Sequence, residues 1–121
     1  MNLNNISEIC LKNAEKRQAN GASIRTDTRS MLKHCATEVV EATEAYNNYC
    51  IADWYSDSPD KRVNYINLTA SEAKKNFSSE LADIICCVLI IAARENIDIE
   101  EAILDCVEKN RKRANKEGDK L

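Results

Sequence analysis

One stretch of the chain, "SELADIICCVLIIAAREN" at residues 79–96, restricts the fold more than any other. From Leu81 to Ala93 every residue is apolar except Asp83. A helix that is apolar around its whole circumference has to be enclosed by other helices. We therefore expect a helical bundle with Asp83 in its interior. A lone buried carboxylate is costly or takes up a proton, so Asp83 requires a cation or a hydrogen-bond network.

The rest of the chain also favours helices. It has two Gly and one Pro in 121 residues, and aromatic residues make up 5%, which leaves little of the turn chemistry that a sheet needs. Four helices are predicted, at about residues 6–19, 28–54, 70–96 and 99–115. Pro59 and its Ser/Asp neighbours predict a loop between the second and third helices. The expected fold class is an all-α, four-helix bundle-like domain that spans residues 1–121.

Short polar motifs set the predicted helix ends. An Asn, Ser, Thr or Asp followed three residues later by Glu is a helix-start signature. Three such pairs precede the first, third and fourth helices: Asn5 with Glu8, Thr69 with Glu72, and Asp98 with Glu101. Asn20-Gly21 is a stop signal for the first helix, because glycine readily takes the left-handed conformation that ends many helices.

The cysteines and the N-terminus indicate where such a chain works. Six cysteines lie within apolar patterns and have no C-x-x-C spacing, so reduced core thiols are favoured over a disulfide framework or a zinc site. The first residues lack the charged and apolar blocks of a signal peptide. The ten-residue apolar run Ile84 to Ala93 is too short to span a bilayer. We therefore expect a cytoplasmic protein with no membrane partner.

A second group of carboxylates lies in "HCATEVVEATEAY", within the preceding predicted helix. On a helical wheel Glu38 falls within the apolar arc and Glu41 on its edge, whereas Glu44 faces solvent. Glu80 lies three residues before Asp83, on the same helix face. Two such pairs that point inward from two helices can form a cage of carboxylate oxygens, which suits Mg²⁺ or Mn²⁺.

Two other interpretations of these residues stay open. Acidic residues three apart are common on solvated helix faces, so Glu38 and Glu41 alone carry little weight. A di-iron site would need Glu-x-x-His on two helices, and the single histidine, His34, lies four residues before Glu38. Iron is therefore disfavoured, and His34 is better explained as an ordinary helix-face residue.

Three segments together resemble a known family. "TEVVEATEA", "SSELADIICCVLIIA" and "IDIEEAILDCVEKNRKRA" look like the MazG-like branch of the all-α NTP pyrophosphohydrolase superfamily, whose relatives include dimeric dUTPases and dCTP pyrophosphatases. The family pattern is E-x-x-E on one helix, E-x-x-D on another, and then a helix that ends in N-x-x-R. The resemblance spans about residues 28–115, and the matching residues are Glu38, Glu41, Glu80, Asp83, Asn110 and Arg113.

The resemblance implies a Mg²⁺-dependent hydrolase that converts a nucleoside triphosphate to its monophosphate and pyrophosphate, in nucleotide-pool house-cleaning. The four acidic residues would hold the metal, and Glu38 or Glu41 would act as the general base. The candidates for binding the phosphates are Lys109, Asn110, Arg113 and Lys120, and those for the nucleoside are Asn13, Tyr46 and Trp54. The chain departs from the family at Thr37, where a further Glu is common, and at Cys106, where a Lys is common.

Two expectations concern partners. An apolar helix in a chain of this length needs cover from a second copy, and the family forms dimers or dimers of dimers, so we expect a homodimer or homotetramer. The alternative function is a non-enzymatic helical interaction module, since residues 109–121 hold six basic and two acidic side chains, net +4, and could bind nucleic acid or an acidic partner. That alternative does not explain Asp83, so nucleic acid is not favoured as a partner.

Overall fold

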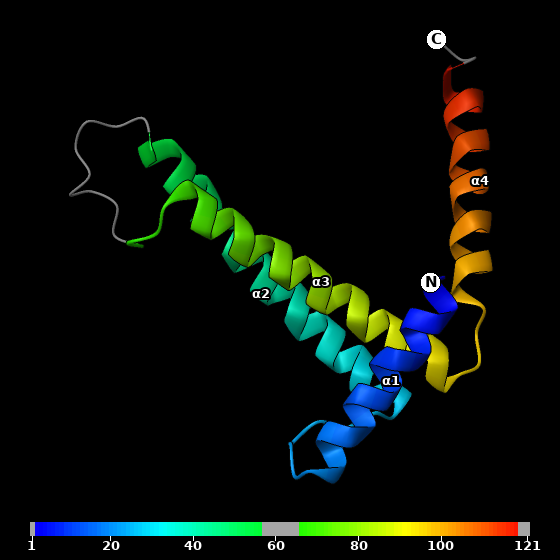
Figure 1. Cartoon of the computed structure of the whole chain (residues 1–121). Coiled ribbons are helices and arrows are strands. Elements are labelled where there is room, and N and C mark those ends of the chain that lie inside the picture. Colours follow the sequence, from blue (N-terminus) through cyan, green and yellow to red (C-terminus); the bar gives the residue numbers. More distant parts are fainter. Residues whose placement is uncertain (1, 57–65, 119–121) are drawn as a thin grey trace. The chain divides into compact units, whose positions relative to one another are not determined.

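Four helices make up the part of the chain that this computed structural model describes, residues 2–56 and 66–118. They are α1 (Leu3–Ala19), α2 (Thr28–Ser56), α3 (Ala70–Arg94) and α4 (Ile99–Gly118) (Figure 1). The prediction of an all-α fold is confirmed, and each predicted helix end lies within three residues of the observed one. Pro59 and most of the loop predicted around it lie outside the described residues.

The start of α1 differs from its prediction. The N-cap is Asn2, whose side chain accepts a hydrogen bond from the backbone N–H of Asn5 at 2.9 Å. The backbone N–H of Ile6 already bonds to the carbonyl of Asn2 at 3.2 Å. Asn5 therefore lies inside the first turn and cannot cap it, because an N-cap residue stands just outside the helix.

The other predicted end signals are confirmed. Thr69 Oγ1 accepts from the backbone N–H of Glu72 at 3.1 Å and donates to its carboxylate at 3.0 Å. Asp98 Oδ1 accepts from the backbone N–H of Glu101 at 3.0 Å. Gly21 and Asn96 follow the ends of α1 and α3 with positive φ angles of 94° and 55°. Both residues thus take the left-handed conformation that closes a helix.

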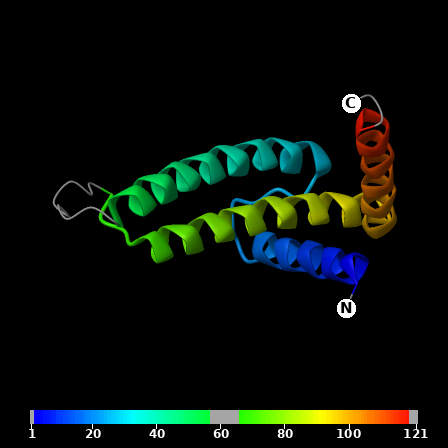
Figure 2. The ribbon, with the colours of Figure 1, turned by 90° about the horizontal axis from the view of Figure 1, so that it is seen from above.

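The chain divides into two compact units, each described by itself. In the unit Arg29–Val88, α2 and the first part of α3 run antiparallel and side by side (Figures 1 and 2). Small side chains line their contact, since Ala42, Ala52 and Ala73 are buried. Small residues let two helix backbones approach closely, which determines how near their polar side chains come to one another.

The second unit contains α1, the end of α3 from Leu89 onward, and α4. The buried hydroxyl of Ser7 donates a hydrogen bond to the carbonyl of Leu89 and holds α1 on α3. The side chain of Asn4 bridges α1 to α4: its amide nitrogen donates to Asp98 Oδ1 at 2.8 Å, and its oxygen accepts from the N–H groups of Ile99 and Glu100 at 3.1 and 3.4 Å. These contacts satisfy backbone donors that the first turn of a helix leaves unpaired.

None of the six cysteines forms a disulfide. Burial, and then the neighbouring Cys35, raises the pKa of the Cys87 thiol to about 12. A thiol in this environment stays protonated and is a poor nucleophile, so Cys87 acts as a small core residue.

The prediction that α3 is enclosed on all sides is wrong for the single chain. Leu81, Ile85 and Val88 are 44%, 56% and 41% exposed. In its own unit, this part of α3 packs beside α2, and one neighbouring helix covers one face only. An apolar face of α3 is therefore left open to solvent.

The composition of α3 also meets the criterion for a membrane span. An 18-residue window of this helix has a mean hydropathy of 1.7, and 22% of that window is buried. The ten-residue apolar run is too short to cross a bilayer, but the helix that contains it is long enough. Every such window includes Glu80 and Asp83, and carboxylates are costly in the hydrocarbon core. Core helices of soluble proteins share this composition.

The bridge made by Asn4 predicts a stability effect. We expect Asn4→Ala to lower the free energy of unfolding by about 1–2 kcal/mol, because it leaves two backbone donors of α4 without their acceptor. Thermal or urea unfolding measures this loss. Asn5→Ala is the matched control, since the side chain of Asn5 takes no part in the bridge. Equal stability of the two variants would contradict the role of Asn4.

Candidate metal centre

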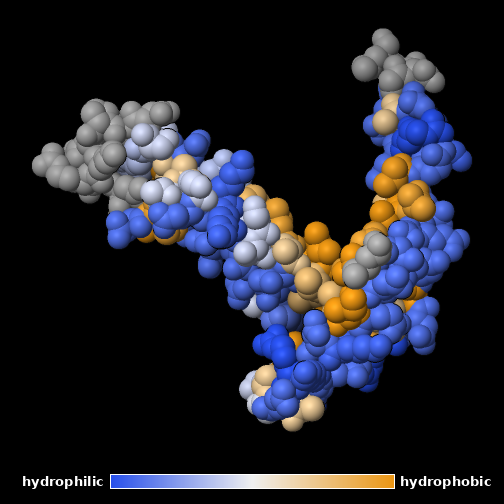
Figure 3. Space-filling view, in the orientation of Figure 1, coloured by the Kyte–Doolittle hydropathy of each residue, from blue (hydrophilic) through white to orange (hydrophobic). Residues whose placement is uncertain are grey.

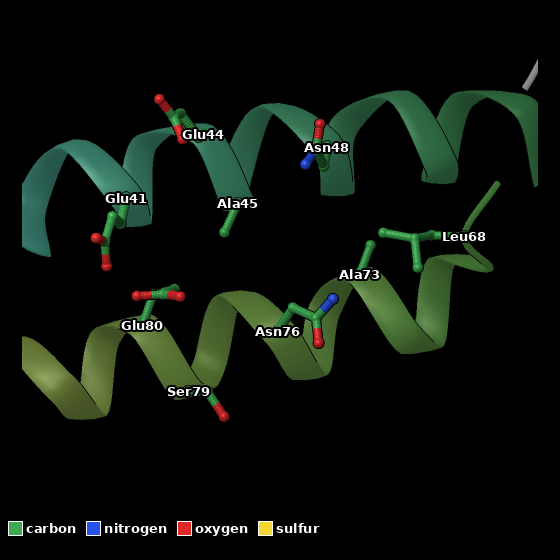
Figure 4. A pocket seen from close by; sticks show the side chains of 9 residues that line it. All are labelled: Glu41, Glu44, Ala45, Asn48, Leu68, Ala73, Asn76, Ser79 and Glu80. Atoms are coloured by element: carbon green, nitrogen blue, oxygen red, sulfur yellow. The ribbon is translucent and has the colours of Figure 1, made fainter. Parts of the chain in front are cut away.

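Three carboxylates from α2 and α3 converge at the contact between these helices. Glu38 and Glu41 are one turn apart on α2, and Glu80 lies on α3. One oxygen from each residue can be chosen so that all three lie within 4.8 Å of one another. Figure 4 shows the side chains of Glu41 and Glu80 pointing toward each other across the two helices. The antiparallel pairing brings the two sequence motifs together, as the spacing predicted.

Glu38 is the most buried member of this cluster, with 8% of its surface exposed. One of its oxygens lies 2.9 Å from His34 Nε2, which is one turn earlier on α2. Its other oxygen, Oε2, is buried without a hydrogen-bond partner, and so is Oε2 of Glu80. Buried polar atoms are nearly always paired, so two unpartnered carboxylate oxygens in one cluster point to a missing positive group.

The electrostatics of the cluster agree with this. Burial raises the pKa of Glu38, and the charges of Glu41 and Asp83 add to that increase, while His34 opposes it. Burial also raises the pKa of Glu80, again with contributions from Glu41 and Asp83. The negative charges of Glu41 and Asp83 thus disfavour the ionised forms of Glu38 and Glu80. A cation at the cluster would reverse this effect and favour the ionised forms.

The donor set fits a hard divalent cation. Carboxylate oxygens are the ligands that Mg²⁺ and Mn²⁺ prefer, and Mg²⁺ is commonly held by a few carboxylates together with substrate phosphates. The unpartnered oxygens of Glu38 and Glu80 belong to this cluster, and such an ion would supply the partner that they lack. His34 makes a contact with Glu38 and is itself exposed, in keeping with the helix-face role expected for it.

Asp83 requires a correction. The sequence placed it in a bundle interior, whereas it is exposed on α3. The cause is the incomplete cover of α3, since α2 is the one helix that packs beside this part of it within the unit. Asp83 still lies near the cluster, because its charge raises the pKa of both Glu38 and Glu80. It stands at the edge of the three-carboxylate cluster and is not a member of it.

A cavity of about 320 Å³ opens beside the carboxylates, between α2 and α3. Figure 4 shows Glu41 and Glu80 at one end, Leu68 at the other, and two asparagines between them. These asparagines, Asn48 and Asn76, were not predicted as site residues. Their spacing is the signal that could have found them, because Asn48 follows Glu41 by two turns and Asn76 precedes Glu80 by about one. The exposed Glu44 points away from α3, as the helical wheel predicted.

The predicted nucleoside-binding residues do not line this cavity. The ring of Tyr46 packs against Phe77, with 5.3 Å between centroids. Trp54 is 70% exposed and packs edge-on against Tyr55 at 4.5 Å. Asn13 is exposed on α1, in the other unit. Their role in binding a nucleoside stays a prediction.

The predicted phosphate-binding residues lie on α4, in the second unit. Lys109, Asn110 and Arg113 are all exposed there. The side-chain amide of Asn110 lies 3.8 Å from the sulfur of Cys106, the position where a lysine was expected from the family pattern. Lys120 lies outside the described residues.

Comparison with known proteins identifies a family. The model of the MazG nucleotide pyrophosphohydrolase domain matches residues 26–117. The match covers α2, α3 and nearly all of α4, and therefore both carboxylate motifs. No curated protein and no solved structure matches the chain significantly.

The raised pKa of Glu38 predicts how the metal-free protein responds to pH. A carboxylate whose pKa is raised on folding lowers stability as the pH rises from its ordinary value through the raised one. Glu38→Gln removes this charge, so it should raise the melting temperature of the metal-free protein at pH 7, and the gain should disappear near pH 4. Melting curves between pH 4 and pH 7 test the direction of this change in melting temperature. Glu15→Gln, on an exposed site of α1, is the control and should show no such trend. A Glu38→Gln variant that is less stable at pH 7 would overturn this account of the cluster.

Proposed function

Because the chain belongs to the MazG nucleotide pyrophosphohydrolase family, we propose that it hydrolyses a nucleoside triphosphate, ribo- or deoxyribo-, to the monophosphate and pyrophosphate. The observation that carries this proposal is the pair of buried, unpartnered carboxylate oxygens of Glu38 and Glu80. A cation bound at this cluster would supply the partner that both oxygens lack. We place this activity in the cytoplasm, as house-cleaning of the nucleotide pool.

The proposed metal ligands are Glu38, Glu41 and Glu80, with Asp83 as a fourth from the edge of the cluster. When bound, Mg²⁺ neutralises triphosphate charge and lowers the pKa of a coordinated water. Mn²⁺ has the same preference for oxygen and could replace it. The two carboxylates of each pair lie one turn apart on the same helix. Because helices are rigid, the ligand atoms are held in place before the substrate arrives.

The general base is Glu38 or Glu41. Either carboxylate can accept the proton of a water molecule that attacks the α-phosphorus, whose bond to the bridging oxygen of pyrophosphate then breaks. Glu41 is exposed and lines the cavity, so it can reach solvent and substrate together. Glu38 is held by His34, which fixes one of its oxygens and leaves the other for the metal.

The proposed phosphate-binding residues are three from α4, Lys109, Asn110 and Arg113, and Lys120, which follows α4 in the sequence. Their side chains offer hydrogen-bond donors for the charge that leaves with pyrophosphate. Cys106 cannot supply the positive charge of the family's lysine. Lys109 and Arg113 would have to provide it from the same helix.

We also propose that the active form is a homodimer or homotetramer. Ile103, Leu104 and Val107 of α4 are 41%, 63% and 61% exposed. Figure 3 shows their helix with apolar side chains gathered along part of its length. An exposed apolar patch on α4 adds to the open face of α3, and such patches mark interaction surfaces. A second copy brings the same two surfaces, so a two-fold arrangement can cover both at once.

The activity test is a panel of ribo- and deoxyribonucleoside triphosphates with Mg²⁺, scored for release of pyrophosphate. We expect turnover of at least one of them. Glu80→Gln should lower kcat/KM by at least ~100-fold, because the amide cannot replace a charged metal ligand. Mg²⁺ should also raise the melting temperature of the unmodified protein and not that of the variant.

Glu15→Gln serves again as the control and should keep normal turnover. If the whole panel stays intact across a range of pH and metals, the enzymatic proposal fails. A protein that instead binds nucleic acid, with melting unaffected by Mg²⁺, would favour the helical interaction module.

The assembly proposal is tested at Leu104. Leu104→Glu places a charge in the exposed apolar patch of α4, so light scattering at micromolar concentration should report a smaller assembly than for the unmodified chain. Ala102→Glu adds the same charge on nearly the opposite side of α4 and should leave the assembly intact. An unmodified chain that is a fully active monomer would refute the proposal.

A further inference from the structure

The cavity beside the carboxylates carries an inference about substrate recognition, one that rests on the proposed function. It begins at Glu41 and Glu80 and continues along the α2–α3 contact as one space (Figure 4). A nucleotide with its phosphates at the metal would have its nucleoside on one side of them. The cavity is therefore placed where the rest of such a substrate would extend.

Small side chains create the space. Ala45 on α2 and Ala73 on α3 line the middle of the cavity, where larger residues would fill it (Figure 4). Its volume of about 320 Å³ lies at the lower end of the range for small-molecule sites, about 300–1,000 Å³. The cavity therefore has room for one small, compact group.

Besides Glu41 and Glu80, the polar residues that line the cavity are Glu44, Ser79 and two asparagines. Figure 4 shows Glu44 pointing away from α3. Asn48 projects from α2 and Asn76 from α3 (Figure 4). Within the described residues, neither side-chain amide forms a hydrogen bond. Within the described residues no Lys or Arg lines the cavity, so its lining offers a phosphate no positively charged side chain. A primary amide offers donors and an acceptor side by side, which is the pattern along the pairing edge of a nucleobase.

We propose that this cavity binds the nucleoside of the substrate, and that Asn48 and Asn76 recognise the base through hydrogen bonds to its edge. The amides contact the base in place of aromatic stacking, since the ring of Tyr46 is already packed on Phe77. Leu68 closes the far end with an apolar surface. Specificity then depends on donor and acceptor positions, because a site with polar groups left unpaired rejects a base that cannot pair with them.

The test uses Asn48→Ala and Asn76→Ala with the same triphosphate panel and Mg²⁺. Each variant should lower kcat/KM for the preferred nucleotide by about tenfold, the effect of one lost hydrogen bond to a neutral group. Both should also reduce the difference in kcat/KM between bases. Inhibition by inorganic tripolyphosphate, which has no nucleoside, should be the same in the variants as in the unmodified protein.

Asn47→Ala is the matched control, because Asn47 is an exposed amide on the same helix that does not line the cavity. It should leave kcat/KM and base preference unchanged. A second variant, Ala45→Leu, fills the cavity without removing a polar group. It should raise KM for every nucleotide while Mg²⁺ still raises its melting temperature.

The outcomes separate this inference from the proposed function. If the unmodified protein is active and both alanine variants keep its kcat/KM and base preference, the recognition by Asn48 and Asn76 is refuted and the hydrolase stands. Equal losses for nucleotides and tripolyphosphate would also refute it, since the effect would then be on the phosphates. If the unmodified protein turns over no triphosphate, NMR with Mg²⁺ and nucleoside monophosphates decides the matter. Shifts of the two side-chain amide signals support the cavity as a nucleoside site, and unshifted signals overturn it.

Discussion

The central constraint on this molecule is that α2 and α3 pack closely with three carboxylates between them. Burial, and then the charges of Glu41 and Asp83, raise the pKa of Glu38 and Glu80, and an oxygen of each lies buried without a partner. Apolar side chains at these positions would pack with no such cost. The contact is therefore unfavourable for these carboxylates in the metal-free chain, and the cation that we propose to bind there would relieve this cost.

The same helix pair provides both the cluster and the space beside it. Buried alanines bring α2 and α3 close enough for carboxylates from different helices to share an ion. Further along, Ala45 and Ala73 leave a cavity that is lined by one asparagine from each helix. Helices hold these side chains more rigidly than loops would. Metal binding and base recognition would thus depend on one packing arrangement.

The rest of the chain has surfaces that one copy leaves unused. An apolar face of α3 and the residues Ile103, Leu104 and Val107 of α4 are open to solvent. The basic side chains proposed for the phosphates are on α4, in a compact unit separate from the carboxylates. A second copy that covers the apolar surfaces would also bring basic side chains to the carboxylates. The proposed activity would then depend on the proposed assembly.

The sequence by itself determined the four helices, the capping motifs at Thr69 and Asp98 and the inward position of Glu38, because these follow from contacts within a few turns of one helix. It also identified both carboxylate pairs. Tertiary structure decided which carboxylates meet: Glu38, Glu41 and Glu80 form the cluster, while Asp83 lies exposed at its edge. An apolar sequence specifies that a helix can be buried, but its cover depends on how many neighbours pack around it. Likewise, the cavity with Asn48 and Asn76 exists only through the register of α2 against α3, which no local pattern encodes.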